Sequence, residues 1–202
     1  MNLELLKTFN FNPTTVLDIG AHLGDFTNQC KSTWPNSEVF MIEANKNCEQ
    51  ALQRFGNNYL IALLGSENKT TTYFTQADNL WGAGNSIYKE LTEVKYNETT
   101  LNMKRLDDLF ESDSLFDLIK IDVQGAEIDV MKGGLELVKR AQCVILELSI
   151  IPYNENAPLY KEVINFMLNL NFVPKIELEK HYIKNKLIQF DLAFFNLSYE
   201  QL

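Results

Sequence analysis

The sequence predicts a single α/β domain in which a mainly parallel sheet is covered by helices on both faces. Short apolar runs are separated by amphipathic stretches, in an order close to strand, helix, strand. Two crossovers of this kind fall within the first third of the chain, as expected for parallel strands. Hydrophobic residues make up 46% of the 202 residues and charged residues 22%, which is typical of globular proteins. We expect one domain over residues 1–202.

The first half of the chain contains three expected strands and two expected helices. The strands cover residues 16–21, 38–44 and 59–64, and the helices cover residues 25–32 and 48–55. Pro35 follows the first helix and Gly56 the second, where these residue types commonly end helices. Residues 66–100 are polar and contain Gly82 and Gly84, which permit unusual backbone angles. We expect this segment to form a loop over the rim of the sheet.

The second half continues the alternation of strands and helices. We expect strands over residues 117–122 and 143–148, helices over residues 125–132 and 160–169, and an antiparallel strand pair over residues 172–178 and 187–196. Gly133 and Gly134 can close the helix before them in left-handed conformations.

Charge and cysteine content exclude several classes of protein. The formal net charge is -9 and no stripe of Lys or Arg occurs, which disfavours nucleic acid as a partner. The chain has no basic start followed by an apolar stretch, and no run near the roughly 20 apolar residues that span a bilayer. We therefore expect a cytoplasmic protein without a membrane partner. Cys30, Cys48 and Cys143 lack metal or redox spacing and are expected to be reduced core thiols.

The segment VLDIGAHLGDFT joins an apolar strand to a glycine-bearing turn and the start of a helix. Gly20 and Gly24 let the backbone approach a ligand without a Cβ clash, and the helix N-terminus offers free N–H groups. Asp18 at the end of the strand can hold an ammonium group or order the turn. Because strand-turn-helix packing also needs glycine, the turn alone is a weak indication of ligand binding.

Glu43 strengthens that indication. It ends the second expected strand, where Rossmann-type folds place an acid that accepts hydrogen bonds from both ribose hydroxyls. This position implies an adenosine nucleoside as ligand. The dinucleotide fingerprint requires a glycine where this chain has His22, so NAD or FAD fits less well.

Two further carboxylates are expected at the same rim. Asp122 ends the strand in LIKIDVQGAE, and Glu147 holds the corresponding place in CVILEL. If these strands are neighbours, the carboxylates lie close enough to act as a base or to bind a metal ion, although Asp122 can equally cap the next helix. Only Asn154 offers a further oxygen ligand, so we expect no metal site. His181 lies in a charged stretch and is expected on the surface.

Together these segments resemble the FkbM family of methyltransferases. The family's DxGA-x-x-G turn is present as DIGAHLG, with His22 in place of the usual Asn, and the resemblance continues through FMIEAN, GNSIYK, LDDL, IKIDVQGAEIDVMKGG, VILEL and QFDLAFFN. IKIDVQGAE is the most specific of these segments. The resemblance implies a Rossmann-like class I methyltransferase fold, with a seven-stranded, mainly parallel sheet, an antiparallel last strand and S-adenosylmethionine as cofactor.

The same resemblance indicates where the cofactor binds. Residues 20–24 would line its methionine portion with Asp18 ordering the turn, Glu43 would bind the ribose, and residues 64–66 would flank adenine. The expected cofactor site comprises Asp18, Gly20, Ala21, His22, Gly24, Thr27, Glu43, Ala44, Leu64, Gly65, Ser66, Ser86 and Asp122. The loop bearing Trp81, Asn85 and Ser86 is expected either to close over the ligands or to be a passive connection.

Many members of the family methylate oxygen atoms of sugars or secondary metabolites. We therefore expect O-methylation of a hydroxyl on a small-molecule or saccharide acceptor, with Asp122 as the first candidate base, followed by Glu147 and His22. Two alternatives are a catalytically inactive module that binds the adenosyl cofactor and an NAD-dependent oxidoreductase. The acceptor and the oligomeric state are open, with a homodimer as one option.

Overall fold

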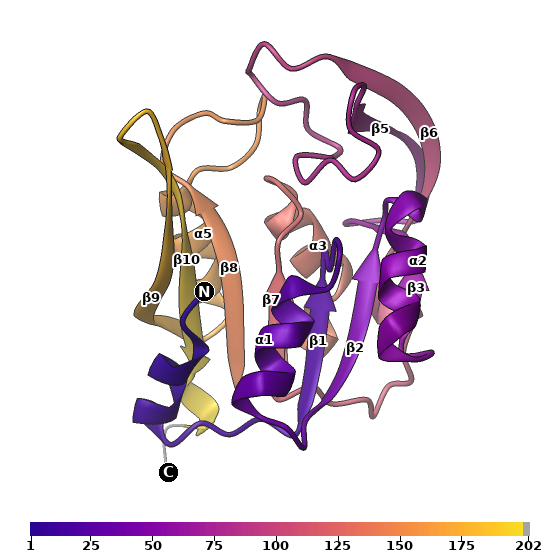
Figure 1. Cartoon of the computed structure of the whole chain (residues 1–202). Coiled ribbons are helices and arrows are strands. Elements are labelled where there is room, and N and C mark those ends of the chain that lie inside the picture. Colours follow the sequence, from indigo (N-terminus) through magenta and orange to yellow (C-terminus); the bar gives the residue numbers. More distant parts are fainter. Residues whose placement is uncertain (200–202) are drawn as a thin grey trace.

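The computed structural model describes residues 1–199, which form a central sheet with helices on both faces (Figure 1). The sheet has seven strands in the order β3-β2-β1-β7-β8-β10-β9. Their bounds are Tyr59–Ile61 (β3), Glu38–Glu43 (β2), Thr15–Ile19 (β1), Leu118–Ile121 (β7), Cys143–Ser149 (β8), Lys186–Asn196 (β10) and Phe172–Ile183 (β9). β10 runs antiparallel to both of its neighbours, and the other pairings in this sheet are parallel. The predicted sheet is therefore confirmed.

Helices cover the two faces of this sheet. One face carries the 3-10 helix η1 (Leu3–Phe9) and α1 (Asp25–Thr33), and the other carries α3 (Glu127–Gly133), α4 (Leu135–Lys139) and α5 (Tyr160–Asn169) (Figure 1). Because successive strand residues point to opposite faces, Val16 and Leu118 pack toward α1, whereas Leu17 and Ile119 pack toward α3 and α5. Within residues 1–199, no helix has the length and apolar character needed to cross a membrane.

Two charged residues interrupt the apolar strands on the α1 face. Asp18 in β1 and Lys120 in β7 are partners in the register of these neighbouring strands, and both are buried. A buried charge is stable only when a partner compensates it, and the register supplies one for each. The centre of the sheet therefore carries a pair of opposite charges directly beneath its carboxyl edge.

Residues 66–100, predicted to be a loop, contain two strands. β5 (Lys69–Gln76) pairs antiparallel with β6 (Tyr96–Lys104), and β6 pairs parallel with β4 (Leu63–Leu64). This three-stranded sheet stands beyond the carboxyl ends of the central strands (Figure 1). The loop prediction was wrong because KTTTYFTQ and YNETTLNMK are polar, although their Thr and Tyr residues favour strands. Only the connection over residues 77–95 remains between β5 and β6.

Several predicted helix and strand boundaries differ from the structure. The predicted strand over residues 59–64 is divided between β3 and β4, which belong to different sheets. The predicted helix over residues 48–55 is a single α-turn between two 3-10 segments, namely η2 (Lys46–Cys48), α2 (Glu49–Leu52) and η3 (Gln53–Phe55). Two more 3-10 segments, η4 (Leu106–Asp108) and η5 (Leu197–Tyr199), precede β7 and follow β10. All three cysteines are free and buried, as predicted.

None of the four glycines at which the sequence permits a left-handed conformation has a positive φ. Gly133 ends α3 and Gly134 has φ -122°, and neither Gly82 nor Gly84 has a positive φ. Glycine is needed at position 133 for space, because a Cβ there would lie 2.0 Å from the carbonyl oxygen of Gly65. This close approach packs α3 against the end of β4.

Candidate active site

A cavity of about 300 Å³ opens at the carboxyl edge of the central sheet. Its floor is formed by residues that lie in or directly after β2, β1, β7, β8, β9 and β10, and residues 82–87 from the β5–β6 connection form its roof. Ligand pockets in proteins commonly measure roughly 300–1,000 Å³ and occur at this edge of open parallel sheets. The position and size of the cavity therefore fit a small-molecule site.

The glycine turn after β1 lines the cavity through Gly20, Ala21 and His22. Gly20 has φ +77°, and a Cβ there would lie 1.8 Å from the carbonyl oxygen of Asp122, so only glycine fits. His22 has φ +50°, a left-handed conformation that is uncommon for residues other than glycine. Gly24 lies outside the lining and packs against Phe55.

Asp18 lies in β1, directly before the glycine turn, and its side chain helps to order that turn. Its side chain is fully buried, and its Oδ2 accepts a 2.8 Å hydrogen bond from the hydroxyl of Thr27. Burial raises the pKa of Asp18 to about 6, although Lys120 and Thr27 act in the opposite direction. Because neither Asp18 nor Thr27 lines the cavity, the structure supports their role in ordering the turn and not a direct contact with an ammonium group.

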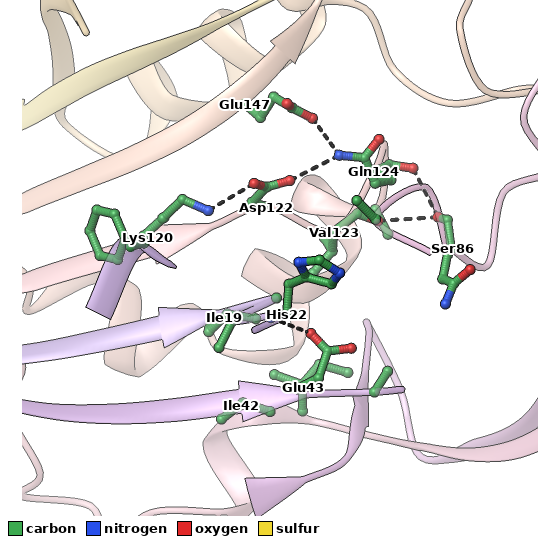
Figure 2. Close-up of a pocket in the computed structure, with 18 of the residues that line it drawn as sticks. Ile19, His22, Ile42, Glu43, Ser86, Lys120, Asp122, Val123, Gln124 and Glu147 are labelled. Carbon is green, nitrogen blue, oxygen red and sulfur yellow. Dashed lines mark hydrogen bonds and ion pairs between the residues drawn. The ribbon is translucent and has the colours of Figure 1, made fainter. Parts of the chain in front are cut away.

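Glu43 lies at the end of β2 and organises the neighbouring backbone. One carboxylate oxygen accepts a 2.7 Å hydrogen bond from the backbone N–H of His22 (Figure 2), and the other accepts a 2.7 Å hydrogen bond from the backbone N–H of Asn45. The side chain lines the cavity, and burial raises its pKa despite these hydrogen bonds. Each oxygen retains acceptor capacity, so Glu43 can also accept hydrogen bonds from two vicinal hydroxyls.

The wall beside Glu43 is mainly apolar. It is built from Ala44, Ala62, Leu63, Leu64 and Tyr73. The predicted role of Leu64 agrees with this placement, whereas Gly65 and Ser66 turn away from the cavity. Gly65 instead packs against the sulfur of Met103, where a Cβ would lie 2.2 Å away, and its N–H bonds to the Lys104 carbonyl. The prediction that Gly65 and Ser66 flank the adenine is not supported.

The connection between β5 and β6 is tied to both sides of the cavity. On the β2 side, the side chain of Asn45 donates a 2.8 Å hydrogen bond to the Leu80 carbonyl, and the imidazole of His22 contacts the Trp81 carbonyl. On the β7 side, the Ser86 hydroxyl lies 3.1 Å and 2.8 Å from the carbonyl oxygens of Val123 and Gln124 (Figure 2). Residues 80–86, which we call the strap, therefore bridge the cavity and form part of its roof.

Asp122 projects into the cavity from the end of β7. Its Oδ2 lies 2.8 Å from Nζ of Lys120, and its Oδ1 accepts a 3.0 Å hydrogen bond from the side-chain amide of Gln124 (Figure 2). Burial opposes ionisation of Asp122, but Lys120 and Gln124 outweigh it and hold the pKa below its usual value. Asp122 is therefore a stable carboxylate.

Glu147 lies close to Asp122, as predicted, because β7 and β8 are neighbours. The amide nitrogen of Gln124 reaches both acids, lying 2.7 Å from Oε2 of Glu147 (Figure 2). The same Oε2 accepts a 2.9 Å hydrogen bond from the side chain of Gln189. Burial, followed by the charges of Asp122 and Asp191, raises the pKa of Glu147 well above its usual value. The two acids thus have opposite protonation preferences within one cavity.

His181 was predicted on the surface; its side chain is 35% exposed and also lines the cavity. Its Nε2 lies 2.8 Å from Oδ2 of Asp191 and 3.8 Å from Oε1 of Glu147. Glu179, His181 and Asp191 each have a potential metal ligand atom within 4.8 Å of the others. The hydrogen bond to Asp191 raises the pKa of His181, however, and so favours the imidazolium, which cannot bind a metal ion.

Sequence reasoning missed several residues of this site: Lys120, Gln124, Glu179, His181, Gln189 and Asp191. Lys120 had a readable signal, because a lysine within the buried run LIKI requires a nearby negative charge. The others come from the β7–α3 turn and from β9 and β10. Their convergence depends on the strand order, which places the C-terminal strands beside β8.

The residues that line the cavity fit S-adenosylmethionine. Glu43 can accept hydrogen bonds from the ribose, the apolar wall can receive a flat base, and the Gly20 cradle allows close approach of a narrow chain. The backbone carbonyl of Asp122 lies against that cradle, and its side-chain carboxylate lines the same cavity, where it complements the positive charges of the methionine end. Asp18, Thr27 and Gly24 support this arrangement from outside the cavity.

Comparison with known proteins identifies the family. A model of the methyltransferase FkbM domain matches residues 18–174. No curated protein matches the sequence. Among solved structures, the methyltransferase FkbM from Methylobacillus flagellatus KT is similar with a TM-score of 0.58 and 15% identity, over 90% of this chain. This chain covers only 43% of the length of that protein.

Two further solved structures share the fold. The magnesium protoporphyrin IX methyltransferase from Synechocystis PCC 6803, with bound SAM, has a TM-score of 0.53 and 10% identity over 96% of this chain and 74% of its own. The 1,6-didemethyltoxoflavin-N1-methyltransferase from Burkholderia thailandensis has a TM-score of 0.51 and 13% identity over 96% and 75%. These comparisons confirm the predicted fold class and, with the family match, S-adenosylmethionine as the cofactor. Since the matched residues include the glycine turn, Glu43, Asp122 and Glu147, this chain belongs to the FkbM methyltransferase family.

Proposed function

We propose that this methyltransferase acts on a hydroxyl oxygen of a polar small molecule or saccharide. The observation that carries the proposal is the division of one cavity into two chemically different ends. Glu43, the apolar wall and the glycine turn form one end, which suits the cofactor. Asp122, Gln124, Glu147 and the β9–β10 residues form the other, where an acceptor would meet hydrogen-bonding groups on several sides. Such a lining suits a polyhydroxyl compound better than a flat apolar one.

The residues of the cavity divide the work of methyl transfer between them. The cofactor supplies an electrophilic methyl group on a sulfonium when it is bound. Glu43 and the backbone of residues 20–22 hold and orient it, and the strap limits the access of water to the reacting atoms. A side chain beside the reacting atoms then receives the proton of the hydroxyl, for which the carboxylates of Asp122 and Glu147 and the imidazole of His22 are the candidates.

Calorimetric titration with S-adenosylmethionine, S-adenosylhomocysteine and NAD tests the cofactor assignment. We expect micromolar binding of the two adenosyl compounds and none of NAD. Binding of NAD alone would overturn the assignment and favour an oxidoreductase.

An acceptor screen tests the reaction type. The protein would be incubated with S-adenosylmethionine and pools of sugars, sugar nucleotides, phenols and amines, and formation of S-adenosylhomocysteine and methylated product would be followed by mass spectrometry. We expect turnover with hydroxyl compounds. Product formed only from amines would refute O-methylation, and binding without turnover over the whole screen would favour the inactive module.

A further inference from the structure

We infer that Glu147 is the group that takes the proton from the acceptor, with Gln124 and Gln189 as its positioning residues, and that Asp122 stays a carboxylate throughout. This inference rests on the proposed O-methyl transfer and assigns one role within it. It reverses the order of candidates expected from the sequence, which placed Asp122 first.

The two oxygens of Glu147 have different surroundings. Oε2 is held by the amides of Gln124 and Gln189, at 2.7 Å and 2.9 Å. Oε1 accepts no hydrogen bond from residues 1–199, and the nearby Nε2 of His181 lies 3.8 Å away, beyond hydrogen-bond distance. The side chain is 9% exposed and lines the cavity. Two amides thus fix the carboxyl group through one oxygen and leave the other available to a ligand.

Both oxygens of Asp122 already have a partner. Nζ of Lys120 contacts Oδ2 and the Gln124 amide donates to Oδ1. Protonation of Asp122 would weaken its ion pair with a lysine that is itself buried, and such pairs are costly to break. Asp122 is therefore suited to stabilise positive charge and poorly suited to accept a proton.

The backbone of Gln124 supports its role as a positioning residue. Gln124 has φ +55°, in the left-handed region, which is strained for a residue with a side chain. This conformation directs the amide between Asp122 and Glu147 (Figure 2). Strained backbone of this kind is concentrated at functional sites, where a side chain must reach a particular place.

The groups that face Glu147 favour proton uptake on balance. Asp122 from β7 and Asp191 from β10 place negative charge nearby, as does Glu127 from α3, whereas Lys120 acts in the opposite direction. His181 is directed mainly to Asp191, but as an imidazolium 3.8 Å from Oε1 it also acts against proton uptake by Glu147. Once ionised, a buried acid with these negative neighbours takes up a proton more readily than an exposed one.

The proton and electron balance is complete with these groups. The acceptor oxygen forms the new bond to the methyl carbon, the electron pair of the carbon–sulfur bond returns to sulfur, and the hydroxyl proton passes to Oε1 of Glu147. The positive charge of the sulfonium and the negative charge of the carboxylate disappear together. The acid then releases its proton to solvent after the product leaves.

The role of Glu147 is testable without a known acceptor. Sinefungin resembles the cofactor but carries an ammonium group in the position of the transferable methyl, so it probes the charge that faces that position. The measurement is the ratio of the dissociation constants of sinefungin and S-adenosylhomocysteine, determined by calorimetry. We expect Glu147→Gln to weaken sinefungin at least about 10-fold relative to S-adenosylhomocysteine, as for loss of one charge-assisted hydrogen bond.

Three controls make the test decisive. Glu177→Gln removes the same charge from an exposed position of β9 outside the cavity and should leave the ratio within about 2-fold of the wild type. Glu147→Asp keeps the charge and should retain part of the preference. Unchanged affinity for S-adenosylhomocysteine shows that each variant is folded. An unchanged ratio in Glu147→Gln, or a larger effect of Asp122→Asn, would overturn the inference, whereas failure of the wild type to bind S-adenosylhomocysteine would overturn the proposed function instead.

Discussion

Nζ of Lys120 lies 2.8 Å from Oδ2 of Asp122, and both side chains project from the same face of β7 toward the cavity. Lys120 also faces Asp18, its partner in register on β1. One buried lysine therefore compensates two carboxylates, of which one supports the glycine turn and the other contacts the acceptor end. The stability of the sheet and the electrostatics of the site depend on the same residue.

Replacement of Lys120 by Met should destabilise the protein more at high pH than at low pH. At pH 8 both acids lose their compensating charge, and we expect a loss of about 3–5 kcal/mol in the free energy of unfolding. Asp18 has a pKa of about 6, raised by burial, so its ionisation costs stability as the pH rises through this value. At pH 5 Asp18 is largely protonated, and the loss should be smaller.

Urea unfolding at pH 5 and pH 8 measures this difference. The exposed Lys132 on α3 provides a matched control, because Lys132→Met removes the same charge without leaving buried acids unpaired. Equal losses for Lys120→Met at both pH values would contradict the role assigned to Asp18.

Glu43→Gln should weaken binding of S-adenosylhomocysteine by about 10- to 100-fold, which corresponds to loss of hydrogen bonds to a charged acceptor. The amide cannot accept hydrogen bonds with both of its polar atoms, as Glu43 does from His22 and Asn45. Calorimetry of both proteins with the 2′-deoxy analogue of S-adenosylhomocysteine, which lacks one ribose hydroxyl, completes a cycle that combines the protein change with the ligand change. If Glu43 binds the ribose, the wild type loses affinity for this analogue and the variant does not distinguish it from the parent compound. Equal discrimination by both proteins would assign the effect to the backbone alone.

The contact between His22 and the Trp81 carbonyl should slow the release of the cofactor product. His22→Ala removes the contact and frees one end of the strap, so dissociation of S-adenosylhomocysteine should accelerate by about 2- to 10-fold, as for one hydrogen bond. The association rate should change less. Stopped-flow fluorescence of the exposed Trp81 reports both rates. Thr92→Ala lies within the same β5–β6 connection but beyond the strap, and it should leave both rates unchanged. A similar acceleration of dissociation in that variant would show that the contact between His22 and the Trp81 carbonyl has no specific role.

Glu179, His181 and Asp191 should not bind a divalent metal ion at neutral pH. The hydrogen bond from His181 to Asp191 favours the protonated imidazole, and binding would require this proton to leave. Metal analysis after dialysis and calorimetric titration with Zn²⁺ and Mn²⁺ at pH 7 measure this directly. Saturable binding that disappears in His181→Ala would contradict the prediction.

The sequence predicted the half of the site that depends on local structure. The turn around Gly20 and the carboxylate of Asp122 directly follow a strand, and the acids Glu43 and Glu147 lie within the last three residues of one. Their placement needs only the position of that strand along the chain. Asp191 and His181 escaped prediction because their approach to Glu147 requires β10 to lie beside β8.

The strap shows a different limit of sequence reasoning. The sequence predicts a long loop here because the segments that form β5 and β6 are mainly polar. They lack the alternation of apolar and polar residues that marks a strand. Their pairing is decided by contacts with β4 and with each other, which are distant in sequence. The sequence therefore did not predict β5 and β6, which carry the strap, whereas it did predict the loop over residues 77–95 that joins them.

The strand order also determines how the acidic residues are spaced along the cavity. Glu43, Asp122, Glu147 and Asp191 stand on β2, β7, β8 and β10, and neighbouring strands are about 4.8 Å apart. Along this scale Asp122 lies two strands from the ribose-binding acid, Glu147 one strand farther and Asp191 one beyond that. If Glu147 takes the proton, the reacting hydroxyl lies near the end of β8. Only β10 and β9 then lie beneath the rest of the acceptor. Under the role proposed for Glu147, the number of strands beyond β8 therefore sets how much of the acceptor the sheet itself would support.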